Sequence, residues 1–368
     1  MIYLDHAATT PPDALAIQAI ETGLRAVWQN PAAAYSASDA ARRELRLARQ
    51  AIADALNAEP QEIIFTSGGT EGNNHAMTLA RTGHAVVGAT EHDSVLRAAR
   101  QLCQEVTLVA PDRSGRICPD AIERALRPET RLISVQFANN ETGVLQPASE
   151  IGALARSRRI PFHCDAVQAF GHVPVDARRC EADLITLSAH KFYGPRGAGA
   201  LYVRTGTRLT PLIDGGGQEF GLRSGTEDVA AIAGMRAAVS LAQADMIDRA
   251  AREQTLMEWF IGKLRRLIPC CRVLGDGAPR LPGISAVLLP GLPSEQAVAD
   301  LDLMEICVSG GSACAARSGE TSRTYRAMGL SDTDARCVLR VSIGRNTTVS
   351  ELEIAADAIA KVYRRRVG

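Results

Sequence analysis

The stretch Asp183-Leu184-Ile185-Thr186-Leu187-Ser188-Ala189-His190-Lys191 passes from a short apolar run into a polar end. The same pattern occurs earlier, where an apolar run over residues 161–164 is followed by Asp165-Ala166-Val167-Gln168. Short apolar runs that end in polar residues are typical of parallel strands, and α/β sheets bind ligands at the carboxyl ends of such strands. We therefore predict an α/β fold in which Asp165 and Lys191 face one crevice.

Working outward from this pair, apolar runs alternate with amphipathic helical runs between residues 40 and 240. Residues 40–56, for example, place apolar side chains at positions 45, 48, 52, 53 and 56, which is the spacing of a helix. Alternation of this kind predicts βα repeats and one large, mainly parallel sheet with helices on both faces. We expect seven strands, at residues 62–66, 85–89, 106–109, 131–136, 161–164, 183–187 and 199–203.

The pattern changes after a long helical stretch at residues 235–268. Strands interrupted by proline and glycine are expected at 282–289 and 338–343, and a helix at 350–366. These features predict a second, smaller α+β domain. We expect a large domain over residues 13–250, and a small domain formed by residues 1–12 and 251–368.

The bulk composition excludes some classes of partner. The 368 residues carry 41 basic and 41 acidic side chains, so the zero net charge gives no electrostatic basis for binding nucleic acid or an anionic membrane. No stretch approaches the roughly 18 uncharged apolar residues of a membrane span. The nine cysteines form no CxxC pair, which indicates a reducing compartment. We expect a soluble, cytoplasmic protein.

Lysine is almost absent from the chain, which makes Lys191 conspicuous. The three lysines are Lys191, Lys263 and Lys361, and arginine supplies the other basic side chains. A guanidinium does not lose its proton in proteins, so a site that needs a neutral amine requires lysine. We hypothesise that Lys191 forms a Schiff base, with a surface lysine as the alternative. For Asp165 the alternative is a helix N-cap.

A glycine-containing segment follows the first expected strand of the sheet. Residues 62–66 lead into Ser67-Gly68-Gly69-Thr70-Glu71-Gly72-Asn73-Asn74, after which we expect a helix to begin. Glycines allow close backbone approach, and amides at a helix N-terminus suit a phosphate. The segment matches neither GxxxxGK[ST] nor GxGxxG. A Schiff-base lysine, a carboxylate for a pyridine nitrogen and a phosphate site together match one cofactor, pyridoxal 5′-phosphate.

Cys314 has unusual neighbours among the cysteines. It lies in Val308-Ser309-Gly310-Gly311-Ser312-Ala313-Cys314-Ala315-Ala316-Arg317-Ser318-Gly319-Glu320, whose small and polar side chains cannot anchor a core. An exposed thiol with Arg317 nearby is suited to nucleophilic chemistry. The alternative is an incidental surface cysteine.

The chain resembles the cysteine desulfurases of the NifS/IscS type, in the class V aminotransferase group of fold-type I pyridoxal-phosphate enzymes. The likeness runs nearly from end to end, and eight blocks in order are more specific than any one of them. The blocks are Tyr3-Leu4-Asp5-His6-Ala7-Ala8-Thr9-Thr10, residues 66–74, Glu91-His92, Asn139-Asn140-Glu141-Thr142-Gly143, Asp165-Ala166-Val167-Gln168, residues 188–191 together with 215–226, Ser312-Ala313-Cys314, and Arg340-Val341-Ser342-Ile343-Gly344-Arg345.

The resemblance implies a role for each matching residue, and no metal. The implied catalytic residues are Lys191, which would hold the cofactor as a Schiff base, Cys314 as nucleophile, and His92, which would stack on the cofactor ring. For His92 a core histidine, and for Arg340 a surface ion pair, are the alternatives. The other implied contacts are Asp165 with the ring nitrogen, Asn140 and Gln168 with the phenolic oxygen, Gly69, Thr70, Ser188 and His190 with the phosphate, Thr226 with the phosphate of the other subunit of a homodimer, and Arg340 with Asn140 for the substrate carboxylate.

The implied reaction converts L-cysteine to L-alanine and leaves the sulfur as a persulfide on Cys314. A sulfur-acceptor protein, such as an iron–sulfur scaffold, would then receive it. Alternatives on the same fold are a selenocysteine lyase and a class V aminotransferase or lyase without persulfide chemistry. An alternative from another class is a non-catalytic sulfur carrier. Cys314 argues against an aminotransferase, because transamination needs no loop thiol.

Overall fold

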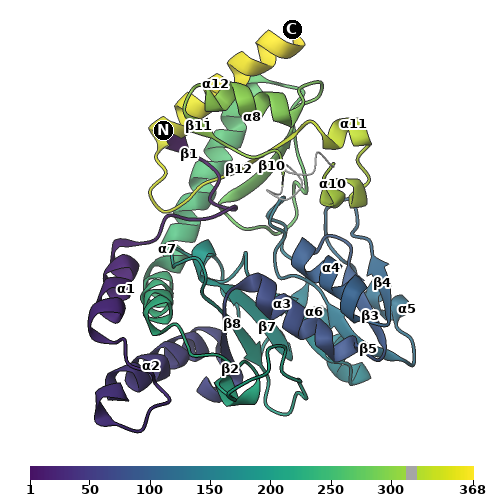
Figure 1. The fold of residues 1–368 in the computed structure, drawn as a ribbon. Coiled ribbons are helices and arrows are strands. Elements are labelled where there is room, and N and C mark those ends of the chain that lie inside the picture. Colours follow the sequence, from purple (N-terminus) through teal and green to yellow (C-terminus); the bar gives the residue numbers. More distant parts are fainter. Residues whose placement is uncertain (312–320) are drawn as a thin grey trace.

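The computed structural model describes residues 1–311 and 321–368. In Figure 1 the large sheet and the helices around it form the lower half of the molecule, and the smaller strands with α8 and α12 form the upper half. The long helix α7 (Val229–Leu267) runs between the two halves. Both chain ends lie in the upper half.

The lower half contains the predicted seven-stranded sheet, with strand order β2-β8-β7-β6-β5-β3-β4. Neighbouring strands are parallel except that β8 is antiparallel to both β2 and β7. All seven predicted strands are confirmed, with ends that differ by at most two residues. They are β2 (Ile63–Thr66), β3 (His84–Gly88), β4 (Glu105–Val109), β5 (Thr130–Ser134), β6 (Phe162–Asp165), β7 (Leu184–Ser188) and β8 (Gly199–Val203).

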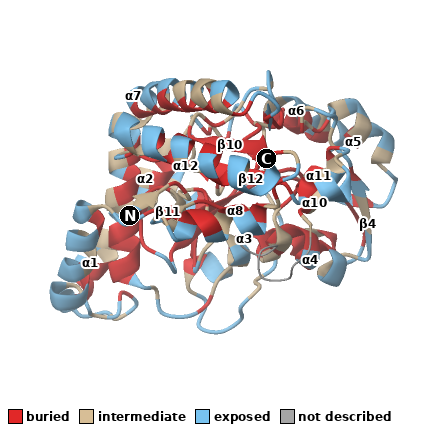
Figure 2. Ribbon diagram, turned by 90° about the horizontal axis from the view of Figure 1, so that it is seen from above, coloured by how far each residue is buried: buried red, intermediate tan, exposed pale blue. Residues whose placement is uncertain are grey.

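Helices cover this sheet. The helix predicted at 40–56 is confirmed as α2, and its five expected apolar positions are buried. The outer faces of the helices are exposed and the interior between them is buried (Figure 2). Continuous apolar strands form here because both faces of the sheet are covered. The helices of this half are α1 (Ala14–Ala26), α2 (Asp39–Leu56), α3 (Gly69–Met77), α4 (Asp93–Leu102), α5 (Pro119–Ala125), α6 (Ala148–Arg158) and the first part of α7.

One expected boundary in this half is wrong. We expected a helix to begin after Asn74, but α3 already begins at Gly69. Gly68 makes the turn with a φ of 144°, a conformation that favours glycine. The backbone of Gly69 then packs so closely that an added Cβ would lie 2.8 Å from Cγ2 of Val167. The two glycines therefore bring the helix N-terminus directly to the end of β2.

The upper half has its own sheets and core. β1 (Ile2–Tyr3) pairs in parallel with β11 (Ile306–Cys307), and β12 (Val338–Ser342), β10 (Ile284–Leu288) and β9 (Arg272–Val273) form an antiparallel sheet. The predicted strands at 282–289 and 338–343 are thus confirmed, as are the helices at 235–268 and 350–366. Among the described residues, the helices of this half are α8 (Ser294–Asp302), α10 (Arg323–Ala327), α11 (Asp332–Ala335), α12 (Val349–Val367) and the later part of α7.

The helix α7 contributes to both hydrophobic cores. Met235, near its start, packs in the core of the large sheet, whereas Phe260 packs with Leu4 and Ile359 in the core of the upper half. The N-terminal strand therefore belongs to the core that the C-terminal helix also builds. The domain boundaries near residues 12 and 250 stay a prediction.

Within residues 1–311 and 321–368, no helix combines the length and the apolar character needed to cross a membrane. The eight cysteines in this part of the chain are free of disulfide bonds.

Candidate active site

A cavity of about 230 Å³ opens where β6 and β7 end, and the upper half closes one side of it. Residues far apart in the sequence line it, from the N-terminal segment to β12. Ten of the predicted site residues are among them, namely Gly69, Thr70, His92, Asn140, Asp165, Gln168, Ser188, His190, Lys191 and Arg340.

Lys191 lies at the end of a short 3₁₀ turn, Ala189–Lys191, that follows β7 directly. Its Nζ donates hydrogen bonds to the carbonyl oxygens of Ala7 (2.5 Å) and Ala8 (3.0 Å). Its own carbonyl oxygen accepts from Nε2 of His172 at 2.8 Å. The N-terminal segment thus orients the amine, and His172 holds the backbone that carries it.

Asp165 ends β6 and is buried. Its Oδ2 accepts from Nδ2 of Asn73 at 2.7 Å, and its Oδ1 accepts from the backbone N–H of Val167 at 2.9 Å. The second bond is a local capping contact, so Asp165 stabilises a turn in addition to facing the cavity. Burial raises the pKa of Asp165, while these hydrogen bonds and nearby His92 and Lys191 oppose the rise.

His92 is the N-cap residue of α4. Its Nδ1 accepts from the backbone N–H of Ser94 at 3.1 Å and lies 2.8 Å from Oγ of Ser94. Because a backbone N–H only donates, the neutral ring carries its proton on Nε2. Burial lowers the pKa of His92, which favours this neutral ring. A neutral, fixed imidazole at the cavity wall is suited to stacking on a planar ligand.

The N-terminus of α3 supplies hydrogen-bond donors for an anion at the cavity. Gly69 and Thr70 form its first turn, where backbone N–H groups have no partner within the helix. Ser188 and His190 line the same cavity. Burial and the charge of Lys191 lower the pKa of His190 to about 4, so that this ring is a neutral hydrogen-bonding group at pH 7. The arrangement suits a phosphate.

Arg340 lies in β12 and is only 1% exposed. The alternative of a surface ion pair is therefore wrong, because the guanidinium in the ion pair that Arg340 forms is buried. Its Nη2 lies 2.7 Å from Oδ1 of Asp5, and its Nη1 donates to the carbonyl oxygen of Asn140 at 2.9 Å. Its Nε has no hydrogen-bond partner among the described residues. A buried guanidinium with an unpartnered donor beside a cavity is suited to bind a carboxylate.

The sequence interpretation assigned no role to two residues that connect the site. Nδ2 of Asn73 donates both to Asp165 and to Oγ of Ser94, the latter at 2.9 Å. Since Ser94 also contacts Nδ1 of His92, one amide links the carboxylate to the imidazole. Asn73 stands in the glycine-containing segment and Ser94 follows His92 closely, but no spacing rule pairs them. Asp5, the partner of Arg340, likewise has no role that the sequence pattern predicts.

One predicted residue of the described chain, Thr226, is not among those that line the cavity. Thr226 is exposed and precedes α7, so its predicted contact with a second subunit stays a prediction. Cys314 lies outside the described residues. The chain on both sides of it contacts the site, because Ser309 exchanges backbone hydrogen bonds with Arg340 (3.2 and 2.7 Å) and Arg323 forms an ion pair with Asp93.

Comparison with known proteins places this site in a family context. The Aminotransferase class-V family model matches residues 2–354. The chain is 37% identical over 376 residues to the cysteine desulfurase IscS of Clostridium botulinum (strain Kyoto / Type A2), covering 99% of this chain and 95% of that protein. It is 38% identical over 373 residues to the cysteine desulfurase IscS of Dictyoglomus turgidum (strain DSM 6724 / Z-1310), with the same coverage. Among solved structures, the NifS-like protein from Rickettsia africae ESF-5 matches with a TM-score of 0.92 and 32% identity over 99% of each chain.

Proposed function

This chain belongs to the class-V aminotransferase family and is a cysteine desulfurase, and we propose that its cavity binds pyridoxal 5′-phosphate on Lys191 while Cys314 receives the sulfur of L-cysteine. One observation carries the proposal. The amine of Lys191, the carboxylate of Asp165 and the guanidinium of Arg340 line a single cavity, although Asp165 and Arg340 are 175 positions apart in the sequence.

The side chains that line the cavity fit this cofactor. Lys191 offers an amine, Asp165 a buried carboxylate for a protonated ring nitrogen, and the start of α3 amide donors for a phosphate. Oε1 of Gln168 has no hydrogen-bond partner in the described part of the chain, although it is buried. A polar ligand in the cavity would donate a hydrogen bond to this acceptor, whereas an apolar one would leave it unsatisfied.

When bound, pyridoxal 5′-phosphate supplies an electron sink for the Cα–H bond of an amino acid. The residues of this chain then have separate tasks. Arg340 and Asn140 hold the substrate carboxylate, and the amine of Lys191 removes the Cα proton. Asp165 keeps its negative charge next to the ring, and His92 covers the ring face.

The sulfur passes to Cys314 in the proposed reaction. The thiolate attacks the substrate sulfur, an S–S bond forms and the C–S bond breaks, so that L-cysteine and a thiol become L-alanine and a persulfide. This exchange balances without an external oxidant or reductant. Gly311, the last described residue before Cys314, is three positions from it in the sequence. Gly311 itself follows the Ser309 contact with Arg340.

We further propose a homodimer in which Thr226 of one subunit reaches the phosphate of the other. Exposure of Thr226 in the single chain is compatible with this role. A sulfur-acceptor protein, for example an iron–sulfur scaffold, and a cytoplasmic location complete the proposal. The free thiols of the described cysteines suit a reducing compartment.

A single turnover with L-cysteine tests the function. The purified protein is mixed with the substrate, alkylated and digested, and the mass of the peptide that contains Cys314 is measured by mass spectrometry. We expect one added sulfur on this peptide and one equivalent of L-alanine. C314A should lose both products yet retain the visible absorbance of the cofactor, whereas C270S, which alters an exposed cysteine of the described chain, should behave as wild type. Alanine formed without added sulfur on Cys314 would contradict the proposal.

A further inference from the structure

Tyr193, two residues after Lys191, has an unusual backbone conformation. It is buried and its φ is +67°, a left-handed value that non-glycine residues seldom adopt. Its N–H donates to Oγ1 of Thr10 at 2.8 Å, and its carbonyl oxygen accepts from the N–H of Asp13 at 2.9 Å. Conformations of this kind persist where the surroundings enforce them, and they concentrate at functional sites. The backbone that carries Lys191 is therefore held tightly on its C-terminal side.

The side chain of Tyr193 contacts the loop that follows β12. The backbone N–H of Arg345 donates to Oη of Tyr193 at 2.7 Å, and the guanidinium carbon of Arg345 lies 4.7 Å from the centre of the ring. At the preceding position, a Cβ on Gly344 would lie only 2.7 Å from the same Oη. The loop and the phenol thus meet without room for a methyl group, and any shift of one must displace the other.

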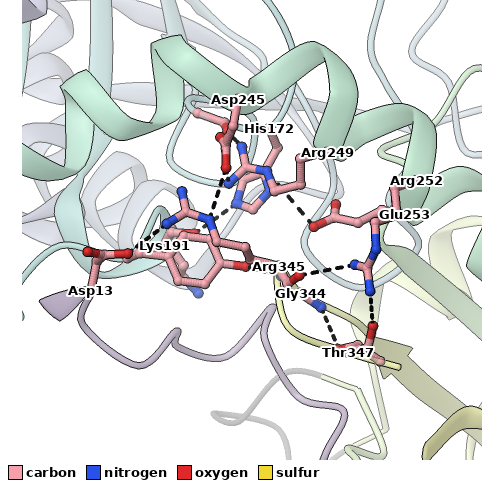
Figure 3. A network of polar contacts seen from close by, with 12 residues as sticks. Asp13, His172, Lys191, Asp245, Arg249, Arg252, Glu253, Gly344, Arg345 and Thr347 are labelled. Atoms are coloured by element: carbon pink, nitrogen blue, oxygen red, sulfur yellow. Dashed lines mark hydrogen bonds and ion pairs between the residues drawn. The ribbon is translucent and has the colours of Figure 1, made fainter. Parts of the chain in front are cut away.

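Ion pairs fix the loop in this position. The guanidinium of Arg345 lies 2.7 Å from Oδ2 of Asp13 and 3.0 Å from Oδ2 of Asp245, which is on α7 (Figure 3). Arg252, also on α7, donates to the carbonyl oxygens of Arg345 at 3.0 Å and Thr347 at 2.5 Å. Asp13 connects Arg345 to the segment of Lys191, because the N–H of Asp13 donates to the carbonyl oxygen of Tyr193, whereas Arg252 holds the loop to α7 through backbone carbonyl oxygens.

We propose that Tyr193 is a positioning residue that couples β12, which carries Arg340, to the backbone of Lys191. The inference rests on the proposed function, in which Arg340 fixes the substrate carboxylate and Lys191 removes the Cα proton. These two groups must keep a set separation, since a displacement of about 1 Å between reacting groups costs on the order of 100-fold in rate. Arg345 is five residues after Arg340 in the sequence, and Tyr193 is two residues after Lys191. The hydrogen bond between Arg345 and Tyr193 therefore connects the segment of Arg340 to the segment of Lys191.

Y193F tests the coupling, because it removes the hydroxyl and keeps the ring. We expect kcat for L-cysteine to fall about tenfold while KM changes less than about twofold, the pattern of a lost positioning contact. A second readout needs no turnover. The rate at which the apo-protein captures pyridoxal 5′-phosphate on Lys191, followed by borohydride reduction and peptide mass, should fall about tenfold as well.

Two further variants separate coupling from general loosening. R345Q removes the ion pairs that press the loop against Tyr193 and should lower kcat and the capture rate in the same direction. R252Q loosens the same loop from α7 and should lower the melting temperature but leave both rates within about twofold of wild type. A Y193F protein that captures cofactor and turns over as wild type does, even with reduced stability, would overturn the coupling. Wild-type protein that captures no cofactor on Lys191 would overturn the proposed function and this inference with it.

Discussion

Replacing Asn73 with alanine should disturb the carboxylate on which cofactor binding depends. Asn73 is buried and its Nδ2 donates to Oδ2 of Asp165 at 2.7 Å. A hydrogen bond to a charged group contributes roughly 1.5–3 kcal/mol, which equals about one to two pKa units. The pKa of Asp165 is already raised by burial, and Asn73 is one of the groups that oppose this rise. N73A should therefore raise the pKa of Asp165 further, by about that amount.

The sign of the pH effect follows from the ionised form that is needed. Asp165 must be negative to pair with a protonated ring nitrogen. If its pKa is higher, the carboxylate becomes protonated at a higher pH when the solution is acidified. The affinity of the apo-protein for pyridoxal 5′-phosphate, titrated by absorbance between about pH 5 and 9, should therefore weaken on the acid side about one to two pH units earlier in N73A than in wild type.

Asn74 provides the matched control for this experiment. It is the next residue on α3, it is partly buried, and its Nδ2 donates to the carbonyl oxygens of Thr70 at 2.8 Å and Ser94 at 3.4 Å without contact to Asp165. N74A should keep the wild-type pH dependence. If N73A and N74A show the same acid limb as wild type, the amide of Asn73 does not support the charge of Asp165, and the reasoning fails.

Three other changes have defined outcomes. R340K replaces a buried, planar donor set with a point charge and should raise KM for L-cysteine about tenfold or more in steady-state assays, so an unchanged KM would remove Arg340 from carboxylate binding. G152A places a Cβ 1.9 Å from the carbonyl oxygen of Cys180 and should lower the free energy of unfolding in urea by about 3 kcal/mol, an expectation that a wild-type midpoint would contradict. Burial raises the pKa of Glu253 to about 7. The stabilisation that its protonated form provides is therefore complete below about pH 4.5 and is lost as the pH rises through 7. E253Q should remove about 3 kcal/mol of this pH dependence of the free energy of unfolding in urea.

Much of the architecture could be predicted because it depends on local pattern. Each strand of the large sheet is a short apolar run between polar ends, and α2 shows one apolar face, so both were recognisable within about ten residues of sequence. The start of α3 was placed too late, since two glycines let a helix begin where their composition indicates a loop. The site residues at the ends of β6 and β7 were predicted from a general property of parallel sheets, and both line the cavity.

The sequence by itself determined the strands, the α/β class and the family, because local spacing and the order of the motifs carry that information. Only the tertiary structure decided which side chains support the site. Asn73 meets Asp165 across 92 positions, Arg340 meets Asp5 across 335, and Arg345 meets Tyr193 across 152. No local pattern encodes such pairs, since each depends on how two separately folded elements pack. The same packing lets the N–H of Arg345 donate to the hydroxyl of Tyr193, yet leaves no space for a Cβ on the neighbouring Gly344.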